Sequence, residues 1–113
     1  LNKQIMITTT TPSIEGKKVT TYMGIVTGET IIGANFIKDL TASLHDFFGG
    51  RSTSYEETLR EAKDTALREM EDRALRMGAN AILSVDLDYE TVGTSGSMLM
   101  VTCSGTAVKV EDC

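Results

Sequence analysis

The sequence predicts one small α+β domain, in the order β-β-α-α-β-β, with a mostly antiparallel sheet and two helices on one face. Two observations predict this class: β-prone runs at both ends of the chain, and helical apolar periods between them. With 113 residues and 41% hydrophobic content, the chain can bury one core. We therefore expect a single domain over residues 1–113, with ragged ends at about 1–4 and 111–113.

Two strands are expected first. Residues 5–11 form a short β-branched run that ends at Pro12. Residues 18–32 form a longer run, and Gly24 and Gly28 lie four apart on one of its faces. We expect the strand to bend here so that a helix or a neighbouring chain can pack closely. The opposite face should carry Val19, Thr21, Met23 and Ile25.

Two helices are expected next. The first covers about residues 35–48, capped by Asn35. The second has about 24 residues, begins near a capping box at Ser54 and ends before Gly78, with a length of about 36 Å. Its apolar face carries Tyr55, Leu59, Ala62, Ala66, Met70, Ala74 and Met77. Pairs of acid and arginine four residues apart support it: Glu56–Arg60, Asp64–Arg68, Glu69–Arg73 and Asp72–Arg76.

Two strands complete the chain. Residues 81–90 alternate between two faces, with Ile82 as an exception. One face is apolar, with Ala81, Leu83, Val85, Leu87 and Tyr89, and the other carries Ser84, Asp86, Asp88 and Glu90. A hairpin loop at 93–96 leads to a strand over 97–110, whose odd positions are small and apolar. The second faces of 18–32 and 97–110 are too apolar for water, so we expect an assembly to cover them.

The charge distribution argues against several classes of partner. The formal net charge is −5, with +1 in residues 1–53 and −6 in residues 54–113. Because no basic stripe is present, nucleic acid and anionic membrane are not expected as partners. No apolar run is long enough to span a membrane, no signal-peptide pattern is visible, and two cysteines make no disulfide framework. We expect a cytoplasmic protein.

A first candidate site lies at the start of the second helix. Arg51 and the free backbone N–H groups could bind a small anion, with hydroxyls from Ser52 and Tyr55. The alternative is that Arg51 forms a salt bridge and the serines cap the helix, and we favour this alternative about two to one.

A second candidate site is a row of carboxylates with a cysteine. Asp86 and Asp88 lie about 7 Å apart along one strand, so a divalent metal would need ligands from another strand or subunit. Cys103 lies in an apolar alternation and normally packs as a small hydrophobe. We therefore treat Asp86, Asp88 and Cys103 as metal ligands only if subunits share them. No catalytic constellation can be assembled around the single histidine, His45, so we do not expect an enzyme.

The sequence resembles the YbjQ family, small bacterial proteins of unestablished function that are often labelled heavy-metal-binding. The resemblance spans about residues 7–110 and rests on motifs that occur together in order: Gly24-Ile25-Val26-Thr27-Gly28-Glu29, Gly33-Ala34-Asn35, Gly49-Gly50-Arg51-Ser52 with Tyr55, Gly78-Ala79-Asn80-Ala81, Asp86-Leu87-Asp88-Tyr89-Glu90 and Ser104-Gly105-Thr106-Ala107-Val108. It implies a dodecin-like subunit in a homopentamer, and it supplies no catalytic residues. His45 stands where that family would have arginine, and Cys103 where a small or aliphatic residue is common, which weighs against either as a family metal ligand.

Our leading hypothesis is a cytoplasmic, non-catalytic, homo-oligomeric module that binds a metal or a small anion. The first alternative is a structural ring that serves as a scaffold and has no ligand of its own. An enzyme with an active site at a subunit interface is the third hypothesis. Because the residues select neither ligand nor metal, the cofactor stays open, with a divalent ion as the only candidate named.

Overall fold

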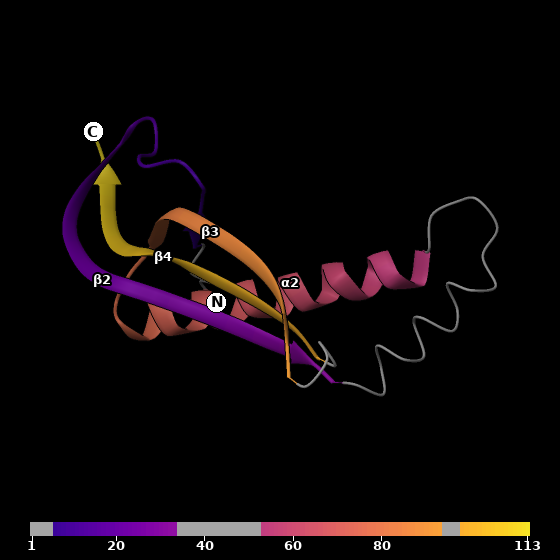
Figure 1. Ribbon diagram of the computed structural model, residues 1–113. Helices are drawn as coiled ribbons and strands as arrows, with labels where there is room; N and C mark the ends of the chain where they lie inside the picture. The colour runs from indigo at the N-terminus through magenta and orange to yellow at the C-terminus, as the bar shows by residue number, and fades with distance from the viewer. Residues whose placement is uncertain (1–5, 34–52, 94–97) are drawn as a thin grey trace, which may run out of the picture.

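A computed structural model describes residues 6–33, 53–93 and 98–113, with only the backbone at 53–55. Four strands form one sheet in the spatial order β1-β3-β4-β2, and a long helix lies along it (Figure 1). The elements are β1 (Ile7–Thr8), β2 (Lys17–Ile32), α2 (Thr53–Arg76), β3 (Ala81–Val92) and β4 (Met98–Asp112). The expected first helix, residues 35–48, lies outside the described residues.

The sheet is mixed and curled. Strand β4 pairs antiparallel with both β2 and β3, as expected for a mostly antiparallel sheet, whereas β1 pairs parallel with β3. Figure 1 shows β2 and β4 curving together at the end of the sheet near the C-terminus. Helix α2 covers one face and packs against β2 and β4. We call the face under α2 the inner face and the opposite one the outer face.

Helix α2 has the 24 residues that the periodicity predicts, and its buried stripe is made of small side chains and one methionine. Ala62, Ala66, Met70 and Ala74 are each at most 5% exposed. Small residues allow the helix backbone to approach the sheet, where the apolar residues of β2, β3 and β4 complete the core. Met77, expected on this face, is 40% exposed because the helix has already ended at Arg76.

The end of α2 follows the Schellman pattern. Gly78 has a φ of +94°, its N–H donates to Leu75 O at 3.0 Å, and the next N–H, of Ala79, donates to Ala74 O at 3.0 Å. The expected glycine C-cap is therefore confirmed. Asn80 then exchanges two hydrogen bonds with the backbone of Val110, at 2.8 and 3.0 Å, which joins the turn to β4.

Strand β2 bends where the glycines predict, but the bend changes which residues face inward. Two register shifts against β4 lie on either side of Tyr22, and Gly24 has a φ of +115°. After the bend Val26 and Gly28 are buried, whereas Ile25 is 81% exposed. The prediction that Met23 and Ile25 share one face was wrong: Met23 packs against the main core and Ile25 is exposed, because the bulge between Tyr22 and Gly24 adds a residue and reverses the alternation between them.

Gly28 confirms the expected close approach of a helix. A Cβ atom at this position would lie 2.0 Å from Ala66 O and 2.9 Å from Met70 N, both backbone atoms of α2. Only glycine therefore allows this spacing between strand and helix.

A bulge also divides β3 between two clusters. Ser84 has a φ of +53°, and the register against β4 shifts between Leu83 and Asp86. Ile82 and Val85 therefore enter the main core, while Ala81 and Leu83 enter a second cluster, with Val108, Val110, Ile7, Ile14 and Val19. The prediction that Ala81, Leu83 and Val85 share one face was wrong for this reason.

Both ends of the described chain differ from expectation. Strand β1 spans two residues rather than the 5–11 predicted, because Thr9 and Thr11 bond each other and Thr11 donates to Ser13 O in a local turn. At the other end β4 continues to Asp112, which pairs with Lys17 in the ladder and by an ion pair of 2.5 Å. Strand β4 therefore ends two residues beyond the predicted end at residue 110.

Candidate functional site

The carboxylate row lies on the outer face of the sheet. Asp86 pairs with Ser104, Asp88 with Thr102 and Glu90 with Met100, in uninterrupted register. All three acids are exposed. Across β4, the same outer face of β2 carries Thr27, Glu29 and Ile31, which pair with Ser104, Thr102 and Met100. We call the row of Asp86, Asp88 and Glu90 the acidic strip. It lies beside the polar residues Thr102 and Ser104 of β4.

The first two acids of this strip, Asp86 and Asp88, influence each other's charge. A hydrogen bond with Asp86 and the negative charge of Asp86 raise the pKa of Asp88 above its usual range, and the charge of Glu90 contributes less. A raised acid pKa means that the ionised form of Asp88 lacks compensating positive charge. Within the described residues no group of three or more His, Cys, Asp or Glu side chains is gathered as a metal site. One chain thus offers a pair of carboxylates, not a complete coordination shell.

The edge of β2 carries an ion-pair network. Arg73 of α2 donates to both carboxylate oxygens of Glu29, at 2.9 and 3.1 Å, to Glu69, and to the Thr27 carbonyl at 2.9 Å. The Arg73 hydrogen bond lowers the pKa of Glu29, and Glu29 in turn raises the pKa of Arg73. The pair Glu69–Arg73 confirms one of the four predicted contacts between acid and arginine along the helix.

Cys103 lies on the other side of the sheet from the aspartates. It is 2% exposed, and its Sγ lies 3.3 Å from Ala66 O and 3.7 Å from Gly28 O, to which the thiol donates. Burial raises the pKa of this thiol, so the thiolate that metals require is disfavoured. The structure therefore does not bring Cys103 together with Asp86 and Asp88. The thiol packs under the helix.

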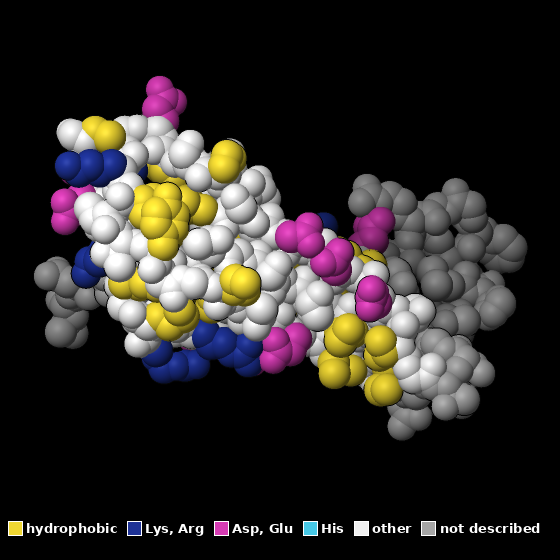
Figure 2. Space-filling model, turned by 60° about the vertical axis from the view of Figure 1, so that its left-hand side comes forward, with side chains coloured by type: hydrophobic (Ala, Val, Ile, Leu, Met, Phe, Trp, Pro, Cys, Tyr) yellow, Lys and Arg dark blue, Asp and Glu magenta, His cyan; other side chains and the backbone are white. Residues whose placement is uncertain are grey.

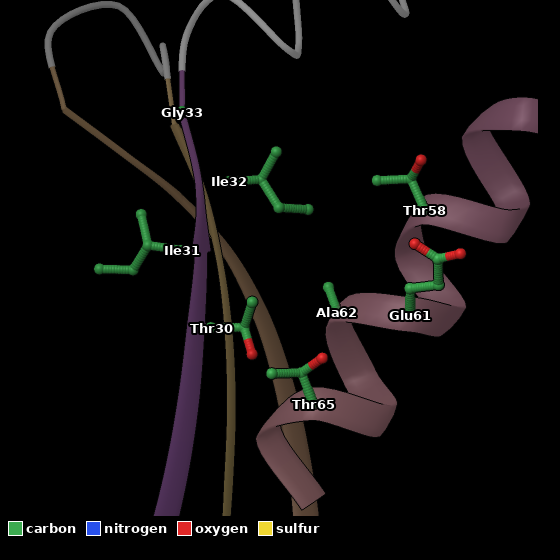
Figure 3. Close-up of a pocket in the computed structure, with 8 residues that line it drawn as sticks. All are labelled: Thr30, Ile31, Ile32, Gly33, Thr58, Glu61, Ala62 and Thr65. Carbon is green, nitrogen blue, oxygen red and sulfur yellow. The ribbon is translucent and has the colours of Figure 1, made fainter. Parts of the chain in front are cut away.

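A cleft lies where α2 and the end of β2 diverge (Figure 3). Its volume is about 340 Å³, and its polar groups are the hydroxyls of Thr30, Thr58 and Thr65 and the carboxylate of Glu61. The hydroxyl of Thr30 is buried and has no hydrogen-bond partner among the described residues. In Figure 3 Ile32 points toward the helix, and Ile31 points away from it.

Sequence reasoning missed this cleft, although a signal was present. Thr58, Glu61 and Thr65 recur at steps of three and four along the helix, beside the apolar stripe. Such a polar row next to a buried face indicates a partly covered polar surface.

The proposed anion site cannot be placed. Arg51 and Ser52 lie outside the described residues, and Tyr55 is described only as part of the α2 backbone. This site stays a prediction.

Acidic and hydrophobic side chains occupy separate areas of one face of the molecule. Figure 2 shows acidic side chains gathered near the middle of one face, with hydrophobic side chains reaching the surface on either side of them. Among the side chains that the structure describes, Tyr22, Ile25, Ile31, Met77 and Tyr89 are the exposed large hydrophobics. No helix in the described ranges is long and apolar enough to cross a membrane.

These features define a class: a small α+β domain with a curled, mixed four-stranded sheet, one long helix on its inner face and an acidic strip on its outer face. The chain belongs to the YbjQ family, whose family model, described as "Putative heavy-metal-binding", matches residues 6–111. The resemblance deduced from the sequence motifs is thereby confirmed.

Close relatives carry no established function. A UPF0145 protein of Acetivibrio thermocellus is 62% identical over 106 residues, which cover 94% of this chain and all of the relative. UPF0145 proteins of two Clostridium botulinum strains, Eklund 17B and Alaska E43, are 59% and 58% identical over the same shares. A solved structure from Pediococcus pentosaceus, described as a protein of unknown function of the DUF74 family, has a similar fold. It matches with a TM-score of 0.59 and 17% identity over 96% of this chain and 100% of that one.

Proposed function

We propose that this chain is a non-catalytic binding module of the cytoplasm, assembled as a homopentameric ring of dodecin-like subunits. Each interface holds a divalent cation on the carboxylates of Asp86 and Asp88. The observation that carries the proposal is the interaction of these two exposed carboxyl groups, which raises the pKa of Asp88. A cation bound between them would supply the positive charge that the described part of one chain does not place there.

The donor atoms favour a hard or borderline cation. Carboxylate oxygens suit magnesium, calcium and manganese, whereas heavy soft metals prefer thiolate and imidazole. Cys103 is buried and hydrogen-bonded on the opposite face, so it does not add a soft ligand to the strip. The proposal therefore departs from the heavy-metal label of the family.

The exposed hydrophobic side chains support the assembly. Ile25 is 81% exposed and Ile31 is 57% exposed, both on the outer face of β2. A ring that covers them would also bring a second set of oxygen ligands to the strip, because symmetry repeats it at every interface.

Metal retention tests the proposal. Protein purified without chelator is dialysed against magnesium, calcium, manganese and zinc in turn, and the metal retained per subunit is counted by elemental analysis, with the subunit number from native mass spectrometry. We expect one oxygen-preferring ion per interface, lost in the double variant Asp86→Asn with Asp88→Asn. Glu111→Gln, an exposed acid on β4, is the matched control and should retain the metal.

The pH dependence gives a second readout. Because the pKa of Asp88 is raised, protons should compete with the cation at a pH above the usual aspartate range near 3.8. Trace retention of every metal by an intact ring would contradict the metal proposal and favour the alternative, a scaffold without a ligand of its own.

A further inference from the structure

We propose that the cleft between α2 and the end of β2 binds a small amino alcohol, a molecule with one ammonium group, one hydroxyl group and a short apolar body. Glu61 binds the ammonium group, Thr30 binds the hydroxyl group, and Ile32 and Ala62 contact the body. The cleft lies between the helix and the inner face of the sheet, whereas the acidic strip lies on the outer face. The cleft is therefore a second site, and its occupant does not depend on the proposed metal.

The helix wall of the cleft is a row of hydrogen-bond acceptors. Thr58, Glu61 and Thr65 lie three and four residues apart, so their side chains share one face of α2. Glu61 is the one charged side chain among the described residues that line the cleft. An ammonium group carries three N–H donors and no acceptor, so it matches a carboxylate with a hydroxyl on either side. An anionic ligand is disfavoured because Glu61 has the same sign of charge.

The strand wall contains a hydroxyl group that lacks a partner. Oγ1 of Thr30 is buried and has no hydrogen-bond partner in the described part of the chain. Such a hydroxyl costs free energy that a valine of nearly the same shape would not. A turn of χ1 to another staggered rotamer moves the hydroxyl out of its buried position. Because Thr30 lines the cleft and points toward the helix in Figure 3, this turn can bring the hydroxyl to a ligand.

Apolar side chains from both elements complete the lining. Ile32 points from β2 toward the helix, and Ala62 belongs to the buried stripe of α2 (Figure 3). The volume of about 340 Å³ is at the lower end of the range for small-molecule sites, about 300–1,000 Å³. One carboxylate with three hydroxyls falls short of the roughly six to eight oxygen ligands that calcium takes. The lining therefore favours a small organic cation over a metal ion.

Four probes of similar length separate the contributions of the two polar groups. Aminobutanol carries both groups, pentylamine lacks the hydroxyl, pentanol lacks the ammonium, and hydroxybutanoate replaces the ammonium by a carboxylate. Each probe is titrated into the intact protein at fixed salt with a chelator present, and binding is followed by NMR of the threonine and isoleucine methyl groups. Aminobutanol should bind roughly fivefold more tightly than pentylamine or pentanol, because an exposed ion pair and a neutral hydrogen bond each contribute about that factor. Hydroxybutanoate should bind most weakly.

Two variants assign the probe groups to residues. Glu61→Gln keeps the shape of the side chain, and it should lower the affinity for both amines about fivefold while that for pentanol is unchanged. Thr30→Val should lower the affinity for aminobutanol to that for pentylamine and leave pentylamine unaffected. It should not lower the Tm of the free protein, because the hydroxyl has no partner to lose among the described residues. Asp72→Asn, at an exposed acid about three turns further along α2, is the matched control and should change no affinity.

Several results would overturn this site. Hydroxybutanoate that binds as tightly as aminobutanol, or amine affinities unchanged in Glu61→Gln, would show that Glu61 does not bind the charged group. A lower Tm of Thr30→Val would show that the hydroxyl already has a partner in the free protein. Shifts confined to the Thr102 methyl, beside Asp88, would place the amine on the acidic strip instead. Because the chelator removes divalent metal, failure of the metal proposal would leave these outcomes unchanged.

Discussion

Replacing Gly28 by alanine tests the packing on which the whole subunit depends. The added Cβ would lie 2.0 Å from Ala66 O, about 1 Å closer than the 3.0 Å limit of real contacts, so α2 must retreat by at least that distance. The obstacle is helix backbone rather than a flexible side chain. The retreat also loosens the buried contacts of Met70 and Ala74. Overpacking of this kind typically costs 1–3 kcal/mol, and we expect the upper end, about 3 kcal/mol.

The stabilising effect that alanine has at the same position is small. Alanine lowers the entropy of the unfolded chain, which stabilises by about 0.4–1 kcal/mol at most. A net loss of about 2–2.6 kcal/mol corresponds to a fall in Tm of roughly 8–11 °C for a domain of this size. Urea unfolding followed by circular dichroism, at one fixed protein concentration, measures the free energy of unfolding of each protein. The m value should be the same for both proteins if the substitution leaves the unfolded state unaffected.

A control variant and a contradicting result can both be stated for Gly28→Ala. Gly33→Ala adds a Cβ with nothing within 4 Å and should change stability by less than about 1 kcal/mol. Adding Ala66→Gly to Gly28→Ala should not restore stability, because the obstructing atom is the carbonyl oxygen and not the Ala66 methyl. A Gly28→Ala protein within about 0.5 kcal/mol of the wild type would show that the helix yields freely and would refute the packing argument.

Three further outcomes are expected. Gly78→Ala should destabilise by about 1–2 kcal/mol in urea unfolding, because φ is +94° there, whereas Gly33→Ala should not. Arg73 lowers the pKa of Glu29, so the stability from this pair should be present above pH 4.5 and be lost as pH falls through the lower folded pKa. Glu29→Gln should remove that dependence, which is small because the pair is exposed to solvent; an unchanged pH profile would contradict it. A thiol-reactive dye should modify Cys113 alone in the native protein and Cys103 as well in urea, and rapid native reaction of both would show that the helix does not shield Cys103.

The sequence predicted the acidic strip itself but not its position relative to Cys103. Alternation after Gly78 placed Asp86 and Asp88 on one face, and the structure confirms that they share the outer face with Glu90. The sequence could not show that Cys103 lies on the opposite face, because this depends on how β4 is registered between β2 and β3. The cleft near Thr30 was also missed, because it arises from the divergence of a strand and a helix that are distant in the chain.

Local chemistry by itself determined the long helix. Its apolar period, the acids that precede arginines and Gly78 at its end depend on neighbours within one or two turns, so the bounds Thr53–Arg76 agree with the prediction. The two glycines of β2 likewise predicted a bend and a close approach, because glycine is the residue that tolerates both.

Only the tertiary structure decided which side chains are buried on either side of the bends. Strand alternation assumes an unbroken period of two, and the bulges at Gly24 and Ser84 each reverse it, which exposes Ile25 and separates Leu83 from Val85. Each bulge is a shift in register against the partner strand β4. The partners of β2 and β3 lie up to 95 residues away, as Lys17 and Asp112 show, and no local pattern carries that information.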